Sequence, residues 1–143
     1  MRQIKRTALV PYACEVVFEV VDQIDAYSEF LPWCAESQVL HRTEMEVIAT
    51  LVLAKSGIRQ SFTTKNQLIR PNAIGLSLVD GPFKQLEGVW AFDALGDAGC
   101  KISLDMRFEF SSKLMDQTFG RVFGVAADRL VDAFTARLDD LYG

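Results

Sequence analysis

Residues 113–142 read KLMDQTFGRVFGVAADRLVDAFTARLDDLY, and this stretch decides the fold. Apolar side chains recur in it at steps of three and four residues, which places them along one helix face: Phe119, Phe123, Ala126, Leu130, Phe134 and Leu138. An unbroken helix of this length spans roughly 40 Å at a rise of about 1.5 Å per residue. Its apolar face therefore needs a wide apolar surface to cover it.

A row of small residues, Gly120, Gly124 and Ala127, lies beside this apolar face. Glycine weakens a helix and small side chains occupy little volume. We expect the row to bend the helix or to leave unfilled space beneath it.

The chain before residue 113 alternates apolar and polar residues, which is the period of strands with one buried face. The clearest case is ISLDMRFEF at residues 102–110, and Gly57, Pro71, Gly81 and Gly96 mark turns between strands. The expected strands fall within residues 3–10, 49–53, 58–68, 74–78, 86–92 and 102–110, with short helices at 14–21 and 25–30. The pattern predicts one α+β domain over residues 1–143, with six or seven antiparallel strands wrapped around the C-terminal helix.

Composition narrows the class of protein. Half of the 143 residues are hydrophobic, the formal charge is -4 and the pI is about 5.0, which argues against a disordered chain and a strongly cationic nucleic-acid binder. No run approaches the roughly 20 apolar residues of a membrane span. Cys14, Cys34 and Cys100 form no C-x-x-C pair, which favours reduced thiols and a cytoplasmic protein.

The inner face of the predicted sheet combines small and polar residues, and two interpretations are open. The small residues are Ala49 and Gly88, and the polar ones that share a face with Phe62 and Leu68 are Gln60, Thr64 and Asn66. An apolar cavity with a few orienting polar groups explains them, because buried polar groups need partners. Ordinary packing, with the polar groups bonded to neighbours, explains them equally well.

Catalytic and metal-binding patterns are absent from the sequence. His41 is the only histidine, so no histidine pair is available for a metal, and no serine or cysteine lies in a nucleophile motif. Asp105 and Glu109 face outward by parity and are interpreted as solvated charges. We therefore expect no metal site and no enzyme activity.

Two exposed features are candidates for partner contacts. Arg59, Lys65 and Lys84 point outward by parity and form a possible basic strip, although solvated surface charges are the commoner explanation. Trp33 follows Phe30, Leu31 and Pro32 in a loop, where it serves either as a lid or contact or as packing over the first helix.

Five runs together resemble the coenzyme Q-binding START-like family of polyketide cyclases and lipid transport proteins. They are RTALVPY at 6–12, Tyr27 with FLPWC at 30–34, FTTKNQL at 62–68, SLVDGPFK at 77–84 and FGRVF at 119–123. The chain is most similar to the bacterial branch of ribosome association toxins. Ala13 departs from the serine usual at that position, which affects the helix cap and not the pocket.

The resemblance implies a helix-grip fold, in which a curved antiparallel sheet of about seven strands surrounds a long C-terminal helix. It also implies a hydrophobic tunnel that holds a polyprenyl quinone such as ubiquinone in support of respiration. For the bacterial branch it implies binding to the large ribosomal subunit, which blocks subunit association. A polyketide cyclase or aromatase, the third alternative, requires a buried acid or base that the sequence does not reveal.

The sequence thus predicts a non-catalytic protein that holds a hydrophobic ligand between the sheet and the last helix, with no DNA partner and at most transient membrane contact. Thr64 and Asn66 are the expected contacts to the ligand's head group. The expected cavity walls are Leu51, Phe62, Leu76, Trp90, Met106, Phe108, Phe119, Phe123 and Ala127.

Overall fold

The structure is a computed structural model that describes residues 1–143. Seven strands form one antiparallel sheet in the order β1-β7-β6-β5-β4-β3-β2. The first and second strands lie at opposite edges, so the chain crosses the whole sheet between them. The strands are β1 (Arg2–Val10), β2 (Cys34–Arg42), β3 (Glu46–Lys55), β4 (Ile58–Ile69), β5 (Ala73–Asp80), β6 (Phe83–Leu95) and β7 (Gly99–Phe110).

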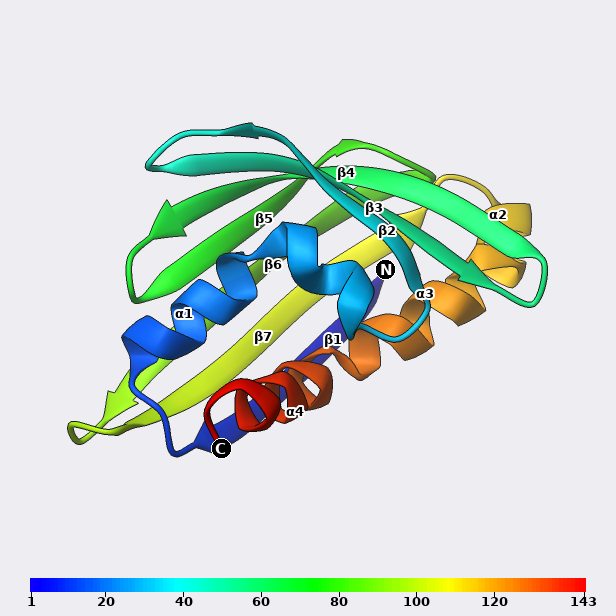
Figure 1. Ribbon diagram of the computed structural model, residues 1–143. Helices are drawn as coiled ribbons and strands as arrows, with labels where there is room; N and C mark the ends of the chain where they lie inside the picture. Colours follow the sequence, from blue (N-terminus) through cyan, green and yellow to red (C-terminus); the bar gives the residue numbers. More distant parts are fainter.

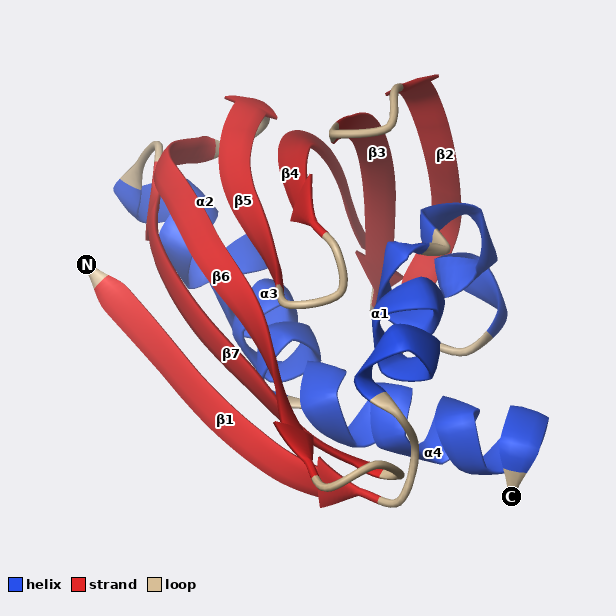
Figure 2. Cartoon of the chain, turned by 90° about the vertical axis from the view of Figure 1, so that its left-hand side faces the viewer, coloured by secondary structure: helices blue, strands red, loops and turns tan.

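The helices pack inside the curve of this sheet (Figure 1). The chain crosses from β1 to β2 through α1 (Cys14–Asp22) and the 3-10 helix η1 (Ile24–Glu29), and it ends with α2 (Lys113–Gln117), α3 (Phe119–Asp128) and α4 (Leu130–Tyr142). Figure 2 shows the strands bending around α3 and α4. α1 packs against β6, β7 and α4, while η1 packs against β2. This arrangement confirms the predicted α+β helix-grip fold. None of the helices is long and apolar enough to cross a bilayer.

The alternation in β7 has the predicted consequence. Ile102, Leu104, Met106, Phe108 and Phe110 are at most 7% exposed, while the residues between them face the outer side of the sheet. The turns also follow the sequence signals, because Gly57 and Gly96 adopt φ angles of 80° and 68° in the β3–β4 and β6–β7 turns. L-residues rarely adopt such angles, which accounts for glycine at both positions.

The predicted single C-terminal helix is instead three helices. Ser112 caps α2 by accepting a hydrogen bond from the Met115 amide at 3.1 Å. The first interruption is at Thr118, whose hydroxyl bonds back to the Leu114 carbonyl at 2.9 Å, and the second is at Arg129, which has a ψ angle of 0°. Thr118 bonds locally to the backbone in the way that commonly bends helices, so the path follows the curved sheet in short segments.

Of the three small residues expected to bend the helix or leave space beneath it, Ala127 lines the cavity described below, whereas the two glycines neither interrupt α3 nor line that cavity. A Cβ atom on Gly120 would lie 2.8 Å from Asp116 Oδ1 and 3.2 Å from Phe110 Cε2. Gly120 therefore allows α3 to approach β7 closely. Gly124 has more room, since the nearest atom to its Cβ position is Arg2 Nη1 at 3.6 Å.

Asp22 fastens the end of α1 to the sheet. Its side chain is only 5% exposed, and Oδ2 accepts hydrogen bonds from Arg42 at 3.0 Å and Arg70 at 3.2 Å. Arg42 also donates to the Asp22 carbonyl at 2.9 Å. Ala13 provides no side-chain cap at the other end of α1, as its sequence predicts. The fixed end of α1 positions η1 over the inner face of the sheet.

Aromatic side chains fill the core in two clusters. The first contains Phe83, Phe108, Phe110, Phe119 and Phe123, whose ring centroids lie 4.8 to 6.1 Å apart in most pairs, and it fixes α3 against the ends of β6 and β7. The second fixes α4 and η1 over the other end of the sheet through Phe18, Tyr27, Phe30, Trp90, Phe92 and Phe134.

Alanine substitutions at the two helical glycines are predicted to have opposite effects. Gly124→Ala should raise the free energy of unfolding by about 0.5–1 kcal/mol, because alanine favours the helix and fits the space. Gly120→Ala should lower it by about 1 kcal/mol, because crowding against Phe110 outweighs the helix preference. Urea unfolding measures both changes. Equal stabilisation by the two variants would contradict the close approach of α3 to β7.

Candidate functional site

A cavity of about 90 Å³ lies between the inner face of the sheet and the helices, in the region between the two aromatic clusters. Nineteen residues line it, and 16 of them are hydrophobic. Three of the lining side chains are small: Ala49 of β3 and Ala126 and Ala127 of α3. Alanines on both the sheet side and the helix side leave part of this space unfilled.

Nine of the eleven predicted cavity residues line this space. β3 to β5 contribute Leu51, Phe62, Thr64, Asn66 and Leu76, and the later elements contribute Trp90, Met106, Phe123 and Ala127. Phe108 and Phe119 do not line it. Both face inward but lie in the first aromatic cluster, where Phe108 packs against Phe123 and Phe119 packs against Phe110. Parity identifies the buried face of a strand but not the position of a residue along the cavity.

The segment before β2 forms a wall that the sequence did not predict. Ile24 and Tyr27 of η1 and Leu31 and Pro32 of the following loop all line the cavity. A 3-10 helix and a loop have no regular apolar period, so no pattern points to them. Leu130 and Phe134 of α4 also line the cavity. Their position on the apolar face of the helix could have predicted them as wall residues.

Thr64 and Asn66 place a hydrogen-bonding pair in the otherwise apolar wall. The Thr64 hydroxyl donates to Asn66 Oδ1 at 2.9 Å, and Asn66 is 6% exposed. The amide nitrogen of Asn66 makes no hydrogen bond within the protein, and it is not fully enclosed by its neighbours. An amide donor left free in an apolar wall favours an occupant that carries an acceptor such as a carbonyl oxygen. Gln60, which shares their strand face, does not line the cavity.

Tyr27 is the only titratable residue in the cavity wall, and it is poorly suited to acid–base chemistry. Its hydroxyl donates to the Val21 carbonyl, and burial together with the nearby Asp22 carboxylate raises the pKa of Tyr27. The proton therefore stays on the phenol at neutral pH. A general acid or base works best with a pKa near the operating pH, so the cavity wall offers no such group.

No group of three or more His, Cys, Asp or Glu side chains is arranged to hold a metal ion. His41 is exposed on β2. Asp105 and Glu109 lie on the outer face of the sheet, where Asp105 accepts a hydrogen bond from Gln3 at 2.9 Å and Glu109 pairs with Lys84.

The three cations predicted as a partner strip each pair with a carboxylate. Arg59 pairs with Glu36, Lys65 with Glu46 at 3.1 Å, and Lys84 with Glu109 at 3.7 Å. Glu36 lies on β2, so its pairing with β4 depends on the folded sheet rather than on sequence proximity. The pairs reduce the net positive charge that this strip presents to a partner.

Trp33 lies outside the cavity wall but borders it, next to Pro32. It has a φ angle of 61° and packs partly buried against the core. Lys55 Nζ lies 5.2 Å and Arg129 Cζ 5.8 Å from the centre of its ring. These two cation–π contacts join the loop before β2 to the β3–β4 turn and to the junction between α3 and α4.

Residues 10–135 match the family model described as polyketide cyclase / dehydrase and lipid transport, and the chain belongs to this family. It is 44% identical over 143 residues to the ribosome association toxin RatA of Vibrio cholerae, covering 100% of this chain and 99% of that protein. It is also 27% identical over 145 residues to the mitochondrial coenzyme Q-binding protein COQ10 of Dictyostelium discoideum, covering 96% of this chain and 69% of that protein. These matches confirm the resemblance seen in the sequence.

Solved structures show the same fold. The crystal structure of TTHA0849 from Thermus thermophilus superimposes with a TM-score of 0.85 at 15% identity, covering 99% of this chain and 100% of that chain. The ZhuI aromatase/cyclase of Streptomyces superimposes with a TM-score of 0.77 at 14% identity, covering 96% and 93% of the two chains. At these identities the likeness concerns the fold alone.

All three cysteines are buried free thiols, two of which have raised pKa values. Burial raises the pKa of Cys34, which follows Trp33, from 9.0 to about 11. Burial and, after it, a hydrogen bond with Cys14 raise the pKa of Cys100 to about 12. The sulfur atoms of Cys14 and Cys100 lie 2.6 Å apart in the core.

The raised pKa of Cys34 predicts a loss of stability at alkaline pH. Between about pH 9 and 11 the unfolded thiol has lost its proton while the folded thiol keeps it, so the free energy of unfolding falls as the pH rises. Below pH 9 the Cys34 thiol is protonated in both the folded and the unfolded state, so it makes no contribution to the pH dependence of the free energy of unfolding. Urea unfolding between pH 8 and 10.5 should show a shallower decline for Cys34→Ala than for the wild type. Parallel declines would exclude burial of the Cys34 thiol.

Proposed function

We propose that this protein binds a hydrophobic small molecule in the cavity between its sheet and its C-terminal helices, without chemical change. The ligand class proposed is a polyprenyl quinone such as ubiquinone, held in support of respiration. The observation that carries the proposal is an apolar cavity whose wall contains one hydrogen-bonding pair, Thr64 and Asn66. The name of the COQ10 relative, a coenzyme Q-binding protein, agrees with this ligand class.

The wall chemistry suits a quinone in two ways. Burial of the isoprenoid tail is favourable by about 25 cal/mol per Å² of apolar area removed from water. A ring carbonyl supplies the acceptor that the Asn66 amide nitrogen lacks. A pure hydrocarbon of the same length leaves that amide without a partner, which costs about 1–3 kcal/mol for a buried group.

The cavity must widen to hold such a ligand. Its volume of about 90 Å³ is below the roughly 300–1,000 Å³ of typical small-molecule pockets. The strands on the sheet side are joined by backbone hydrogen-bond ladders, whereas Leu31 and Pro32 lie in a loop and Leu130 follows the interruption at Arg129. We propose that the loop and α4 move outward when the ligand enters.

The absence of turnover is proposed on the basis of the wall residues. Cyclisation or dehydration requires a proton donor or acceptor close to the substrate, and Tyr27 is the only titratable residue in the wall. The shared fold of the ZhuI aromatase/cyclase does not supply one, because chemistry depends on site residues rather than on the fold.

Filling the cavity should abolish loading and preserve the fold. Ala127→Leu adds three carbon atoms to a wall position that is 4% exposed. We expect at least a tenfold decrease in ubiquinone recovered by organic extraction of the purified protein, with an unfolding free energy equal to or up to about 2 kcal/mol above that of the wild type.

The matched control is Ala136→Leu, which makes the same change on the exposed side of α4. Native mass spectrometry of both variants gives the number of ligands per chain. Undiminished loading of a folded Ala127→Leu variant would place the ligand outside this cavity.

A second function, association with the large ribosomal subunit and a block of subunit joining in the cytoplasm, is proposed because the RatA relative is similar along the whole chain. The partner surface proposed for it is the outer strip of Arg59, Lys65 and Lys84. Ribosomal RNA attracts cations through its phosphates, so such binding weakens steeply with salt.

Charge reversal tests this surface. The triple variant Arg59→Glu, Lys65→Glu, Lys84→Glu should reduce co-sedimentation with large subunits. The slope of the logarithm of the binding constant against the logarithm of the salt concentration should become less steep by about 3, one for each lost phosphate contact. Its ubiquinone loading should equal that of the wild type, because the three residues lie outside the cavity wall. Unchanged co-sedimentation would assign ribosome binding, if present, to another surface.

A further inference from the structure

Cations without an acidic partner concentrate on one side of the molecule. Nine of the 15 Lys and Arg side chains form ion pairs and six do not. Two of the unpaired cations, Lys101 and Arg107, lie on β7. The other four come from the end of β3, the start of α2, the middle of α3 and the α3–α4 junction: Lys55, Lys113, Arg121 and Arg129.

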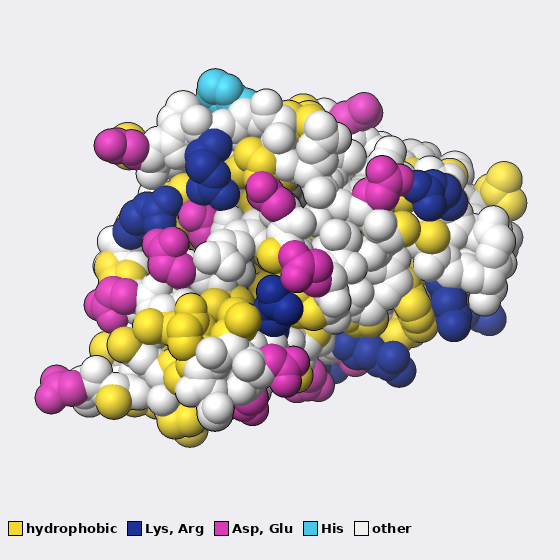
Figure 3. Space-filling view, viewed as in Figure 1, with side chains coloured by type: hydrophobic (Ala, Val, Ile, Leu, Met, Phe, Trp, Pro, Cys, Tyr) yellow, Lys and Arg dark blue, Asp and Glu magenta, His cyan; other side chains and the backbone are white.

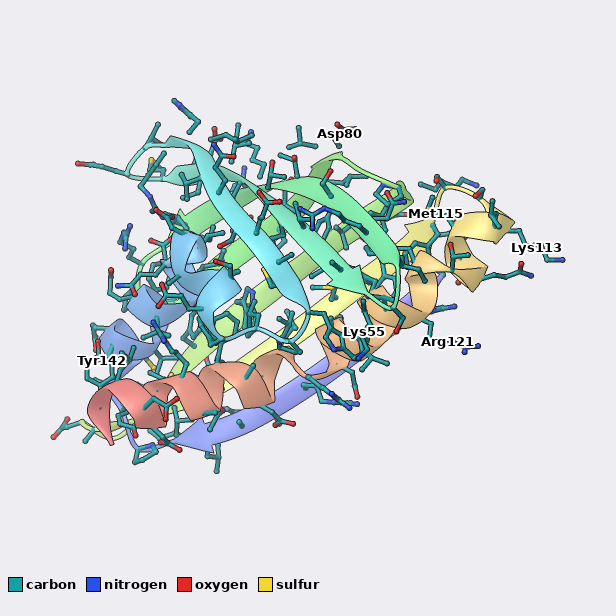
Figure 4. All side chains as sticks on the ribbon, turned by 45° about the vertical axis from the view of Figure 1, so that its right-hand side comes forward. Lys55, Asp80, Lys113, Met115, Arg121 and Tyr142 are labelled. Carbon is teal, nitrogen blue, oxygen red and sulfur yellow. The ribbon has the colours of Figure 1, made fainter.

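These four cations, together with Leu114 and Trp33, form what we call the cationic face. In Figure 4, Lys55, Arg121 and Lys113 lie along the same side of the molecule, from the β3–β4 turn across α3 to α2. Lys and Arg atoms gather in the same region at the lower right of Figure 3. Arg129 joins them through Trp33, whose ring it shares with Lys55. The nearby acids Asp116 and Asp128 are paired with Arg2 and Arg6.

An open hollow beside this face suits a phosphate group. Arg2, Asp116, Gln117 and Arg121 line it, its volume is about 410 Å³, and none of its residues is hydrophobic. Arg2 pairs with Asp116, which leaves the Arg121 guanidinium available to an anion. Guanidinium groups bind phosphate oxygens through two parallel hydrogen bonds. Leu114, one turn before Thr118, is 67% exposed next to these charges.

The cationic face adjoins the cavity. Trp33 and Arg129 are the chain neighbours of Pro32 and Leu130, which line the cavity, and the two side chains contact each other. A molecule that approaches this face therefore meets the loop before β2 and the α3–α4 junction, which form part of the cavity wall opposite the sheet.

We infer that the cationic face docks on the surface of an anionic lipid bilayer. Lys55, Lys113, Arg121 and Arg129 attract lipid phosphates, Leu114 inserts among the acyl chains, and Trp33 lies at the depth of the head groups, where tryptophan is enriched. A chain of formal charge -4 gains this attraction only because its unpaired cations are concentrated locally.

Two observations favour a bilayer over RNA as the partner of this face. An exposed leucine among the cations gains nothing from a phosphate backbone, whereas it gains from burial in lipid. Single-stranded RNA is held by bases that stack on aromatic rings, and the Trp33 ring is already contacted by Lys55 and Arg129. The inference does not depend on a bound quinone, because empty protein presents the same face.

Vesicle sedimentation tests the inference. Wild-type protein should sediment with vesicles of phosphatidylglycerol and phosphatidylcholine, should not sediment with phosphatidylcholine alone, and should be released by roughly 0.5 M salt, which screens surface charges. The triple variant Lys55→Gln, Lys113→Gln, Arg121→Gln should bind at least tenfold more weakly, since each cation contributes about a fivefold increase in partition, equivalent to about 1 kcal/mol. Leu114→Ser should weaken binding severalfold.

The matched controls carry the same charge change elsewhere. The control triple variant, Lys65→Gln, Lys84→Gln, Lys101→Gln, removes three cations that lie outside the cationic face. A second control, Leu95→Ser, removes an exposed leucine from the β6–β7 hairpin. Both control variants should bind vesicles as the wild type does. Wild-type protein that ignores anionic vesicles, or a control triple variant that loses as much binding as the test variant, would overturn the inference. Binding to polyuridylate without binding to vesicles would assign the face to RNA and overturn it as well. Ubiquinone loading is measured separately, with quinone supplied in detergent and no vesicles present. Protein that loads quinone but ignores vesicles would overturn the bilayer docking alone and leave the proposed ligand standing.

Discussion

The rest of the structure depends on how the apolar face of α3 and α4 is covered by a single curved sheet. Two aromatic clusters hold this face, one through Phe123 against β6 and β7 and one through Phe134 against Trp90 and η1. Between them the facing side chains are small, as at Ala49 and Ala127. Close packing at both ends fixes the distance between helix and sheet, so the small residues in the middle leave a cavity instead of allowing the layers to collapse.

The two walls of the cavity are built differently. The sheet side is held by antiparallel hydrogen-bond ladders, while the opposite side consists of η1, the loop to Trp33 and the junction at Arg129. The Asp22 contacts with Arg42 and Arg70 fix only one end of that second wall. In the two functions proposed above, the cavity holds the apolar ligand and the outer surface contacts the macromolecular partner, so the two sites are separate. The family description and the name of the RatA relative support these proposals.

The sequence predicted six of the seven strands, the C-terminal helical face and most of the cavity wall, because burial imposes fixed periods on strands and helices. It missed β2, an edge strand whose side chains are mostly exposed or half-buried, so no apolar alternation marks it. It misplaced Phe108 and Phe119, since parity does not show how far along the sheet a side chain lies. It missed Tyr27 because a 3-10 helix has no regular apolar period. The helix interruption at Thr118 depends on a local hydroxyl bond, and the neutralised cation Arg59 depends on Glu36, 23 residues away, which only the folded sheet brings near.

The most direct test of the cavity as a ligand site is the fluorescence of Trp90, which lines it and is 3% exposed. The Trp33→Phe variant leaves Trp90 as the only tryptophan. Titration of delipidated variant with a short-chain ubiquinone should quench this fluorescence in a saturable manner, with an end point at one quinone per chain. Quenching that rises linearly without saturation, as for free tryptophan in solution, would contradict the account.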